Sequence, residues 1–279
     1  MNINNDNQQN TFSLRGFNIV SSMLSIINHS DENDVNYTLA NYLLAHIDTL
    51  DSMSIYDVID DCFVSRSTIH RFIKSIGFDS FTHMKDNVKR LRIHSMAFID
   101  FVNQPTFKDS IVKSMDEMLK DINSTIAAQN IEELVEKIFS RRNIVILNAD
   151  TSSSSAKEFQ LEMVSIGRLI KLVTNLSSNT GILNALTEED LLITCSASGN
   201  YAIITKDDVK DVKAHKVLIT LNHAKQLNDY YDDIYFLSNN FQACEYISNG
   251  MQNVYTRYGI NYFFDLLFSI YVQNYYVKN

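Results

Sequence analysis

The sequence predicts a multidomain chain: an all-α N-terminal domain followed by an α/β domain with a doubly wound, five-stranded parallel sheet. The length of 279 residues is sufficient for two hydrophobic cores. One proline and only seven glycines favour long, uninterrupted helices. After about residue 110, short apolar β-branched runs alternate with helical patterns, which is typical of a parallel sheet covered by helices.

The N-terminal domain is predicted to contain five helices. Apolar periodicity places them at residues 17–28, 37–47, 54–62, 65–76 and 81–101. Ser54 and Asp57 have the spacing of a capping box, and Gly77 is a suitable residue just after the end of the fourth helix. The only proline, Pro105, marks a hinge. We therefore predict domains at 1–102 and 111–279, joined by a hinge at 103–110.

The second domain is predicted to begin with one long helix at 111–139. Five strands follow, at 143–149, 169–173, 191–195, 216–220 and 234–237. Helices at 154–166, 180–186 and 201–212 separate the first four strands, and a closing helix covers about 242–276. This alternation is the basis for predicting the doubly wound sheet.

Composition excludes several classes of protein. The N-terminus has no basic and apolar pattern of a signal peptide, and no run of 18 apolar residues predicts a membrane span. Three widely separated cysteines, Cys62, Cys195 and Cys244, form neither a metal motif nor a closed disulfide framework. We therefore expect a cytoplasmic protein with no membrane contact, no metal site and no cofactor.

Charge is segregated within this acidic chain of net charge −9. Residues 31–61 contain eight acidic side chains and no Lys or Arg. Residues 62–94 contain seven basic and two acidic side chains, a local charge of +5. A local reversal of this kind is typical of a nucleic-acid-binding segment, although a solvated helical face is the alternative explanation.

Residues 54–77 have the pattern of a helix-turn-helix unit. In its second helix, Ile69, Phe72, Ile73 and Ile76 form one apolar stripe, and Ser65 is placed to cap the helix. The remaining faces carry polar and basic residues: Arg66, Ser67, His70, Arg71 and Lys74. Hydroxyls, basic side chains and helix N-termini hold phosphates, and side chains at the start of such a helix reach base edges.

The same segment resembles the N-terminal domain of the RpiR/MurR family of bacterial transcriptional regulators. The family pattern is V-S-x-x-T-x-x-R-F, then L-G-F/Y and F-x-x-x-K, and the matching residues are Val64, Ser65, Thr68, Arg71, Phe72, Gly77, Phe78, Phe81 and Lys85. The chain departs from the family at Ile59, usually a small residue, and at Phe63, where glycine is frequent. We expect DNA contacts from Ser65, Arg66, Ser67, Thr68, His70, Arg71, Lys74 and Lys85.

Two hydroxyl-rich loops follow predicted strands in the second domain. Residues 148–157 resemble G-x-G-x-S-x-x-x-A-K, with Asn148 and Asp150 in place of both glycines. Residues 196–201 resemble S-x-S-G-x-T, with Tyr201 in place of Thr. These patterns resemble the SIS (sugar isomerase) domain of the same family, as does the segment 257–268, which is similar to the dimer-forming helix. The resemblance implies a sugar-phosphate site, and the candidate residues are Ser152, Ser153, Ser154, Ser196, Ser198 and Gly199.

The leading hypothesis is a DNA-binding transcriptional regulator of sugar metabolism that senses a phosphosugar. A homodimer or homotetramer would place its helix-turn-helix units on operator half-sites of double-stranded DNA about 34 Å apart. One alternative is an effector-free regulator with a vestigial pocket. Another is a phosphosugar isomerase with an accessory helical domain, which would need a general base. We expect no enzyme, because the candidate bases lie in no recognisable motif: Glu158, Glu162, His215, His223 and Glu245.

Overall fold

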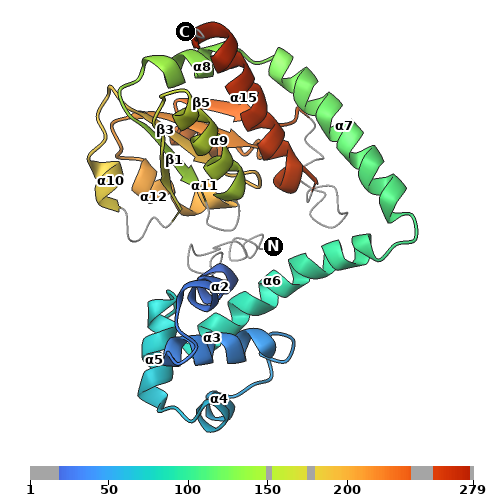
Figure 1. The fold of residues 1–279 in the computed structure, drawn as a ribbon, viewed down its shortest axis with the longest axis vertical. Coiled ribbons are helices and arrows are strands. Elements are labelled where there is room, and N and C mark those ends of the chain that lie inside the picture. Colours follow the sequence, from blue (N-terminus) through green and yellow to red (C-terminus); the bar gives the residue numbers. More distant parts are fainter. Residues whose placement is uncertain (1–18, 149–152, 175–179, 240–253, 277–279) are drawn as a thin grey trace, which may run out of the picture. The chain divides into compact units, whose positions relative to one another are not determined.

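The computed structural model describes residues 19–148, 153–174, 180–239 and 254–276, and it separates the chain into two compact units (Figure 1). The first unit comprises residues 1–96 and the second residues 97–279. Pro105 lies in the turn between helices α6 and α7, inside the predicted hinge. Domain boundaries at residues 102 and 111, on either side of this hinge, stay a prediction. None of the helices in the described ranges is long and apolar enough to span a bilayer.

The first unit is entirely helical, as predicted. Its helices are α2 (Ile19–His29), α3 (Val35–Ala45), α4 (Ile55–Cys62), α5 (Arg66–Ser75) and α6 (Phe81–Val102). Their apolar faces meet in one core, which includes Leu39, Leu43, Val58, Ile69 and Phe72. Burial of these side chains is the main stabilising contribution to a helical unit of this size.

Local sequence determines where α4 and α5 begin and end. The hydroxyl of Ser54 accepts hydrogen bonds from the backbone N–H groups of Tyr56 and Asp57, and the Asp57 carboxylate accepts one from the Ser54 N–H, which completes the predicted capping box. After α5, Gly77 adopts a φ of 93°, and the Phe78 N–H bonds to the Ile73 carbonyl at 3.0 Å. This is a Schellman motif, which confirms Gly77 as the residue that ends the helix.

The second unit is built on a five-stranded parallel sheet. The strands are β1 (Ile144–Asn148), β2 (Lys171–Val173), β3 (Leu191–Cys195), β4 (His215–Thr220) and β5 (Asp233–Phe236), in the order β2-β1-β3-β4-β5. Ile146 of β1 pairs with Leu172 on one side and Ile193 on the other. The strand order reverses at β1 and β3, so the predicted doubly wound sheet is confirmed.

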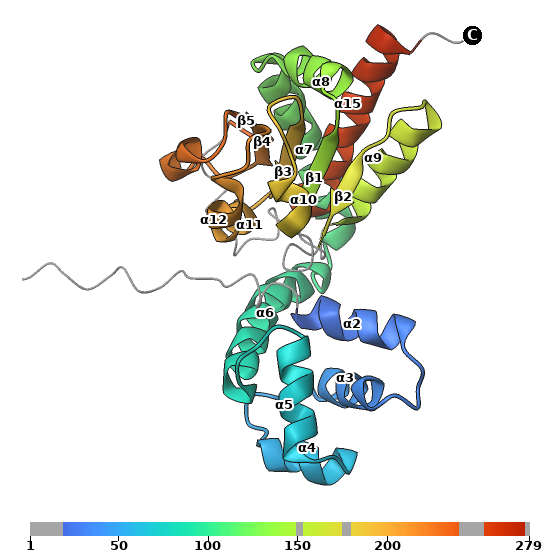
Figure 2. The same ribbon diagram turned by 90° about the vertical axis from the view of Figure 1, so that its left-hand side faces the viewer.

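Helices cover both faces of this sheet (Figure 2). α9 (Ser153–Ser165) and α8 (Ile131–Ser140) pack beside the closing helix α15 (Ile260–Tyr275) on one face. α10 (Thr180–Asn184), α11 (Asn200–Ile204) and α12 (Lys206–Val209) lie on the other. A 3-10 helix, η2 (Lys225–Asp229), and a π-helical turn, η4 (Tyr255–Gly259), complete the described part.

The predicted single helix at 111–139 is wrong, because two helices occupy this region. α7 (Phe107–Ala127) ends before α8 begins at Ile131. Between them, the Gln129 side chain donates to the Phe236 carbonyl at 2.8 Å and accepts from the Phe236 N–H at 2.7 Å. The Gln129 side-chain amide thus satisfies the backbone N–H and carbonyl of Phe236 on edge strand β5. The break between α7 and α8 places Gln129 beside this strand.

Two other predicted helices also need correction. The helix predicted at 201–212 is divided into α11 and α12 at Thr205, whose hydroxyl donates to the Tyr201 carbonyl at 2.8 Å. A side chain that bonds back to the preceding turn commonly bends or ends a helix. The closing helix predicted from 242 is described from residue 254, and residues 242–253 lie outside the described ranges.

Candidate nucleic-acid interface and sheet-edge site

Helix α5 presents two opposite faces. Its inner face is buried and consists of Ile69, Phe72 and Ile73, followed by Ile76 just after the helix. Its outer face is an exposed stripe at positions i, i+3, i+4 and i+7: Ser67, His70, Arg71 and Lys74. The stripe carries two fixed cations and two further hydrogen-bonding groups, which is the composition needed to contact phosphates and base edges.

The hydroxyls at the start of α5 serve the helix itself. Ser65 caps it by accepting from the Thr68 N–H at 3.2 Å. The Ser65 Oγ also lies 2.7 Å from Ser67 Oγ and 2.9 Å from Thr68 Oγ1. The neighbouring Arg66 side chain is exposed to solvent. Of the residues predicted to bind DNA here, Ser65 and Thr68 therefore have an observed structural role.

An open groove of about 800 Å³ lies where the N-termini of α4, α5 and α6 meet. A serine caps each helix: Ser54, Ser65 and Ser80, the last by accepting from the His83 N–H at 3.1 Å. The lining is partly apolar and partly polar or basic: Met53, Ser54, Ile55, Arg66, Ser67, His70, Ser80, Phe81, Thr82 and Lys85. Helix N-termini and basic side chains both attract anions, so the groove is suited to a phosphate backbone.

Lys85 forms a specific contact inside the first unit. Its Nζ donates to the Met53 carbonyl at 2.7 Å, and it lies 5.8 Å from the centre of the Phe81 ring. The bond links α6 to the segment that leads into α4. Sequence reasoning selected Lys85 as a DNA contact but missed this bond, because the two residues are 32 positions apart.

The sheet-edge site lies at the carboxyl ends of the strands, where doubly wound folds bind ligands beside the strand-order reversal. Gly199, at the start of α11, has a φ of 75°. A Cβ added to Gly199 would lie 2.5 Å from the Asn222 Cβ, so glycine is required here. Asn222 also donates from Nδ2 to the Ser198 carbonyl at 2.9 Å, which fixes this loop against the end of β4.

The candidate serines differ in their surroundings. Ser196 is buried, and its hydroxyl accepts from the Ala202 N–H at 3.3 Å. Ser198 is half-buried and accepts from the Asn200 N–H at 3.3 Å. Ser153 begins α9 and Ser154 is exposed in its first turn, whereas Ser152 lies outside the described residues. The adjacent Ser155 hydroxyl donates to Asn261 of α15, a long-range contact that could not be predicted from local spacing.

The candidate general bases are not brought together. His215 lies at the amino end of β4, where its Nε2 contacts the Asp233 carboxylate at 2.6 Å. His223 follows β4 and bonds to the Ser238 carbonyl at 2.7 Å. Glu158 and Glu162 are on α9, and burial together with nearby carboxylates raises the pKa of Glu162. Glu245 lies outside the described ranges. Within the described part, no cluster of His, Cys, Asp or Glu could hold a metal ion.

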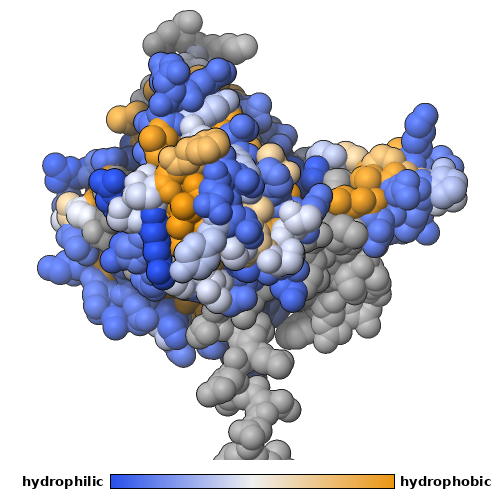
Figure 3. Space-filling model, turned by 90° about the horizontal axis from the view of Figure 1, so that it is seen from below, coloured by the Kyte–Doolittle hydropathy of each residue, from blue (hydrophilic) through white to orange (hydrophobic). Residues whose placement is uncertain are grey.

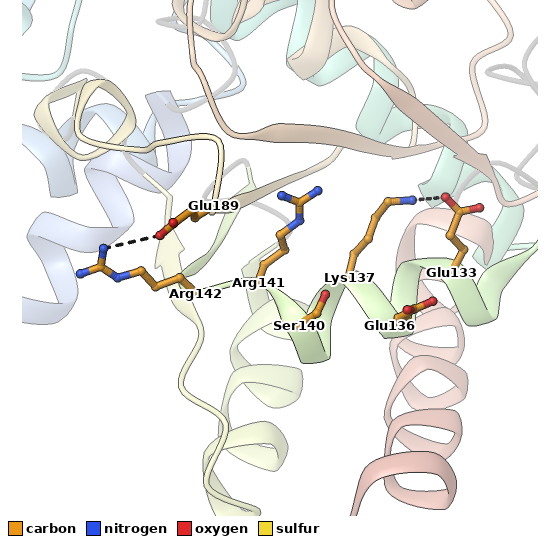
Figure 4. A pocket seen from close by; sticks show the side chains of 7 residues that line it. All are labelled: Glu133, Glu136, Lys137, Ser140, Arg141, Arg142 and Glu189. Carbon is orange, nitrogen blue, oxygen red and sulfur yellow. Dashed lines mark hydrogen bonds and ion pairs between the residues drawn. The ribbon is translucent and has the colours of Figure 1, made fainter.

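A second pocket, of about 530 Å³, lies at the amino edge of the sheet, opposite the serine loops (Figure 4). Its cations are paired with neighbouring groups. Lys137 contacts Glu133 and also lies 3.1 Å from Asp233, and Arg142 lies 3.8 Å from Glu189. Arg141 donates to the Glu188 carbonyl at 2.7 Å. Each Lys and Arg of the lining is thus already paired within the same unit.

Comparisons with known proteins bear on both units. Residues 17–91 match the family model described as "Helix-turn-helix domain, rpiR family". The chain is 26% identical over 212 residues to the HTH-type transcriptional regulator CPE0189 of Clostridium perfringens, which covers 69% of this chain and 74% of that protein. It is 22% identical over 170 residues to the HTH-type regulator YfhH of Escherichia coli, covering 58% of this chain and 60% of YfhH.

One solved structure is similar to this chain over most of its length. The structure of Vibrio vulnificus NanR in complex with ManNAc-6P covers 92% of this chain and 93% of NanR, with 14% identity and a TM-score of 0.48. The matched family model spans α2 to α5 and the first half of α6, which includes the exposed stripe and the groove. Residues 17–91 therefore form a helix-turn-helix domain of the rpiR family.

Proposed function

We propose that α5 contacts the operator and that the sheet domain senses a sugar phosphate, so that the protein regulates genes of sugar metabolism in the cytoplasm. The observation that carries the DNA contact is the exposed stripe of α5, backed by the groove at three helix N-termini. Arg66, Ser67, His70, Arg71 and Lys74 are the proposed contacts. Ser65, Thr68 and Lys85 are proposed to shape the interface, since their polar atoms bond within the unit.

Two copies of the chain are proposed to act together on DNA. One helix-turn-helix unit reads a single half-site, and dimers read two half-sites about 34 Å apart. A sugar phosphate that binds the free protein more tightly than the DNA-bound protein, or the reverse, would change the operator affinity by the same factor.

The decisive experiment for DNA binding removes the two central cations. Arg71→Ala combined with Lys74→Ala should abolish operator binding at physiological salt. At low salt, the slope of log affinity against log salt concentration should fall by about 2, since each lost phosphate contact contributes about 0.9. Binding is measured by fluorescence anisotropy on an operator selected from genomic fragments.

The matched control removes two exposed lysines of α7, Lys113→Ala with Lys120→Ala, and changes the net charge equally. It should bind DNA like the wild type. Equal DNA affinity of the α5 variant and this control would contradict the proposed role of α5.

The proposed ligand site is formed by the loop of Ser198 and Gly199 together with the start of α9. Its support is the position at the carboxyl ends of β1 and β3, beside the strand-order reversal, and the positive φ of Gly199 at the start of α11. The protein is proposed to bind the phosphosugar without converting it, because the candidate bases are dispersed.

A thermal-shift panel of hexose and amino-sugar phosphates tests this site, with the unphosphorylated sugars as controls. A ligand at 100 times its Kd adds about 2.7 kcal/mol to the free energy of unfolding, so a true effector should raise Tm measurably. If no compound shifts Tm, the effector-free alternative is favoured. If a bound compound is isomerised, which NMR would detect, the isomerase alternative is favoured.

A further inference from the structure

The groove at the start of α5 has an apolar part that phosphate binding does not use. Met53, Ile55 and Phe81 line it beside the basic and hydroxyl-bearing residues. Met53 is 9% exposed, and Ile55 and Phe81 are half-buried and pack partly against the core of the first unit. Figure 3, which views the molecule from the side where α4 lies in Figure 1, shows orange apolar side chains among hydrophilic ones. Because a phosphate is not stabilised by apolar contact, this part of the lining suits a different group of the ligand.

The apolar part of the groove is held in place within the unit. Lys85 donates to the Met53 carbonyl at 2.7 Å, and its Nζ lies 5.8 Å from the centre of the Phe81 ring. One side chain thus joins the segment before α4 to the first turn of α6. Ile55 begins α4, directly after Ser54 and its capping box. The positions of Ile55 and Phe81 are therefore set before a ligand binds, which lowers the cost of binding one.

The groove opens onto the face of α5 that is proposed to contact DNA. Ser67 and His70 belong to the exposed stripe of α5 and also line the groove. A duplex that meets the stripe at these two residues therefore also reaches the apolar part. Among the ten described residues of the lining, Arg66 and Lys85 are cationic and none is a carboxylate. The charge of the groove thus suits a polyanion, and its apolar part suits an apolar group of that polyanion.

We propose that Ile55 and Phe81 contact the 5-methyl group of a thymine in each operator half-site. In the major groove of DNA the bases present hydrogen-bonding groups and one kind of apolar group, the thymine methyl. An apolar surface beside side chains that reach base edges is complementary to this methyl group. The inference deepens the proposed function and rests on it in one respect: α5 must face the operator. The groove then reads sequence as well as holding the DNA backbone.

Deoxyuridine scanning tests the proposal, because uracil differs from thymine only by the missing methyl group. Each thymine of an operator selected from genomic fragments is replaced in turn, and the affinity of the full chain is measured by fluorescence anisotropy. The wild type should lose about fourfold in affinity at one thymine of each half-site, the effect of one buried methyl group. The operators with thymine and with uracil at this position are then compared in variants.

Ile55→Ala removes the proposed methyl contact. This variant should bind the thymine operator about fourfold more weakly than the wild type does, and it should bind the uracil operator as tightly as the wild type does. A variant that only deformed the unit would weaken binding to both operators equally. Ile55→Thr keeps the branched shape of the side chain and shortens its apolar part, so it provides the same comparison if the alanine variant unfolds.

Ile59→Ala is the matched control. Ile59 is a half-buried isoleucine of the same helix, and it lies outside the described lining of the groove. This variant should retain the fourfold preference for thymine over uracil. Thermal unfolding of each variant checks that the first unit stays folded.

Three results would overturn the inference: no thymine of the operator is sensitive to loss of its methyl group, the folded Ile55 variants retain the full preference for thymine, or they weaken binding to both operators equally. The first result is expected if the apolar part packs on deoxyribose. All three leave the DNA contact of α5 intact. Failure of the wild type to bind any DNA would instead overturn the proposed function.

Discussion

The two candidate sites of this chain use their polar groups in opposite ways. On α5, the side chains of Ser67, His70, Arg71 and Lys74 are exposed and turned away from the core. At the sheet edge, the hydroxyls of Ser155, Ser196 and Ser198 and the amide of Asn222 bond to other parts of the same unit.

This difference shows how each site depends on its surroundings. The α5 face needs only a stable helix, because its groups already point into solvent. The sheet-edge loop keeps its shape through contacts between distant segments, so a change in one segment alters the whole loop. Substitutions at the sheet edge should therefore act mainly on stability, and substitutions on α5 mainly on binding.

The largest effect is expected at Gly199. Gly199→Ala places a Cβ 2.5 Å from the Asn222 side chain and also strains a φ of 75°. We expect it to lower the free energy of unfolding of the sheet unit by about 3 kcal/mol or more, as the sum of backbone strain and overpacking. Urea unfolding followed by CD measures this loss.

Gly167 provides the matched control for Gly199. It has a φ of 82°, but nothing lies within 4 Å of a Cβ added there. Gly167→Ala should therefore cost only the strain of the left-handed region, about 1–2 kcal/mol. An equal loss of unfolding free energy in the two variants would show that the close approach of Asn222 does not contribute to the effect at Gly199.

A second prediction concerns Asp190, which is 2% exposed at the amino end of β3. Its carboxylate accepts hydrogen bonds from the N–H and side-chain amide of Asn143 and from the N–H and hydroxyl of Thr187. Asp190→Asn turns an NH₂ group toward these donors and should cost about 2–3 kcal/mol. The loss should appear in the same urea experiment and leave DNA affinity within twofold.

Asp190 also makes stability depend on pH. Burial raises the pKa of this carboxyl, but the four hydrogen bonds outweigh burial, and the pKa is lowered. Stability from a lowered pKa is complete above the unfolded value of about 3.9 and is lost as pH falls through the folded pKa. The urea midpoint of the wild type should thus decrease below about pH 4 more steeply than that of Asp190→Asn. Parallel pH profiles would contradict this role.

The sequence was sufficient for features determined within a few residues. The Ser54–Asp57 capping box, the Gly77 helix end and the apolar stripe of α5 all follow from spacing alone, and the structure confirms each. The doubly wound parallel sheet followed from the alternation of strands and helices along the chain. These features determine the fold and the exposed stripe of α5.

Contacts between distant positions could not be predicted. The Gln129 bonds to Phe236 span 107 positions and divide a helix that periodicity joins. The Ser155 bond to Asn261 spans 106 positions and joins α9 to the closing helix α15. A single sequence without an alignment carries no signal for such pairs. The exposure of Ser67, His70, Arg71 and Lys74 could be predicted, because local spacing determines it, whereas their contact with DNA stays a prediction.

The smallest predicted effect separates the two roles of Lys85, which matches a DNA-binding family pattern yet bonds to the Met53 carbonyl. Lys85→Met keeps the aliphatic stem and removes that bond, so the first unit should lose about 1 kcal/mol of stability. DNA affinity should fall only slightly, and the slope of log affinity against log salt should stay unchanged. A slope reduced by about 0.9 with unchanged stability would instead place Lys85 on a phosphate, with the exposed cations of α5. The salt slope decides, because loss of a positioning bond weakens binding equally at every salt concentration, whereas a lost phosphate contact also reduces the number of released counterions.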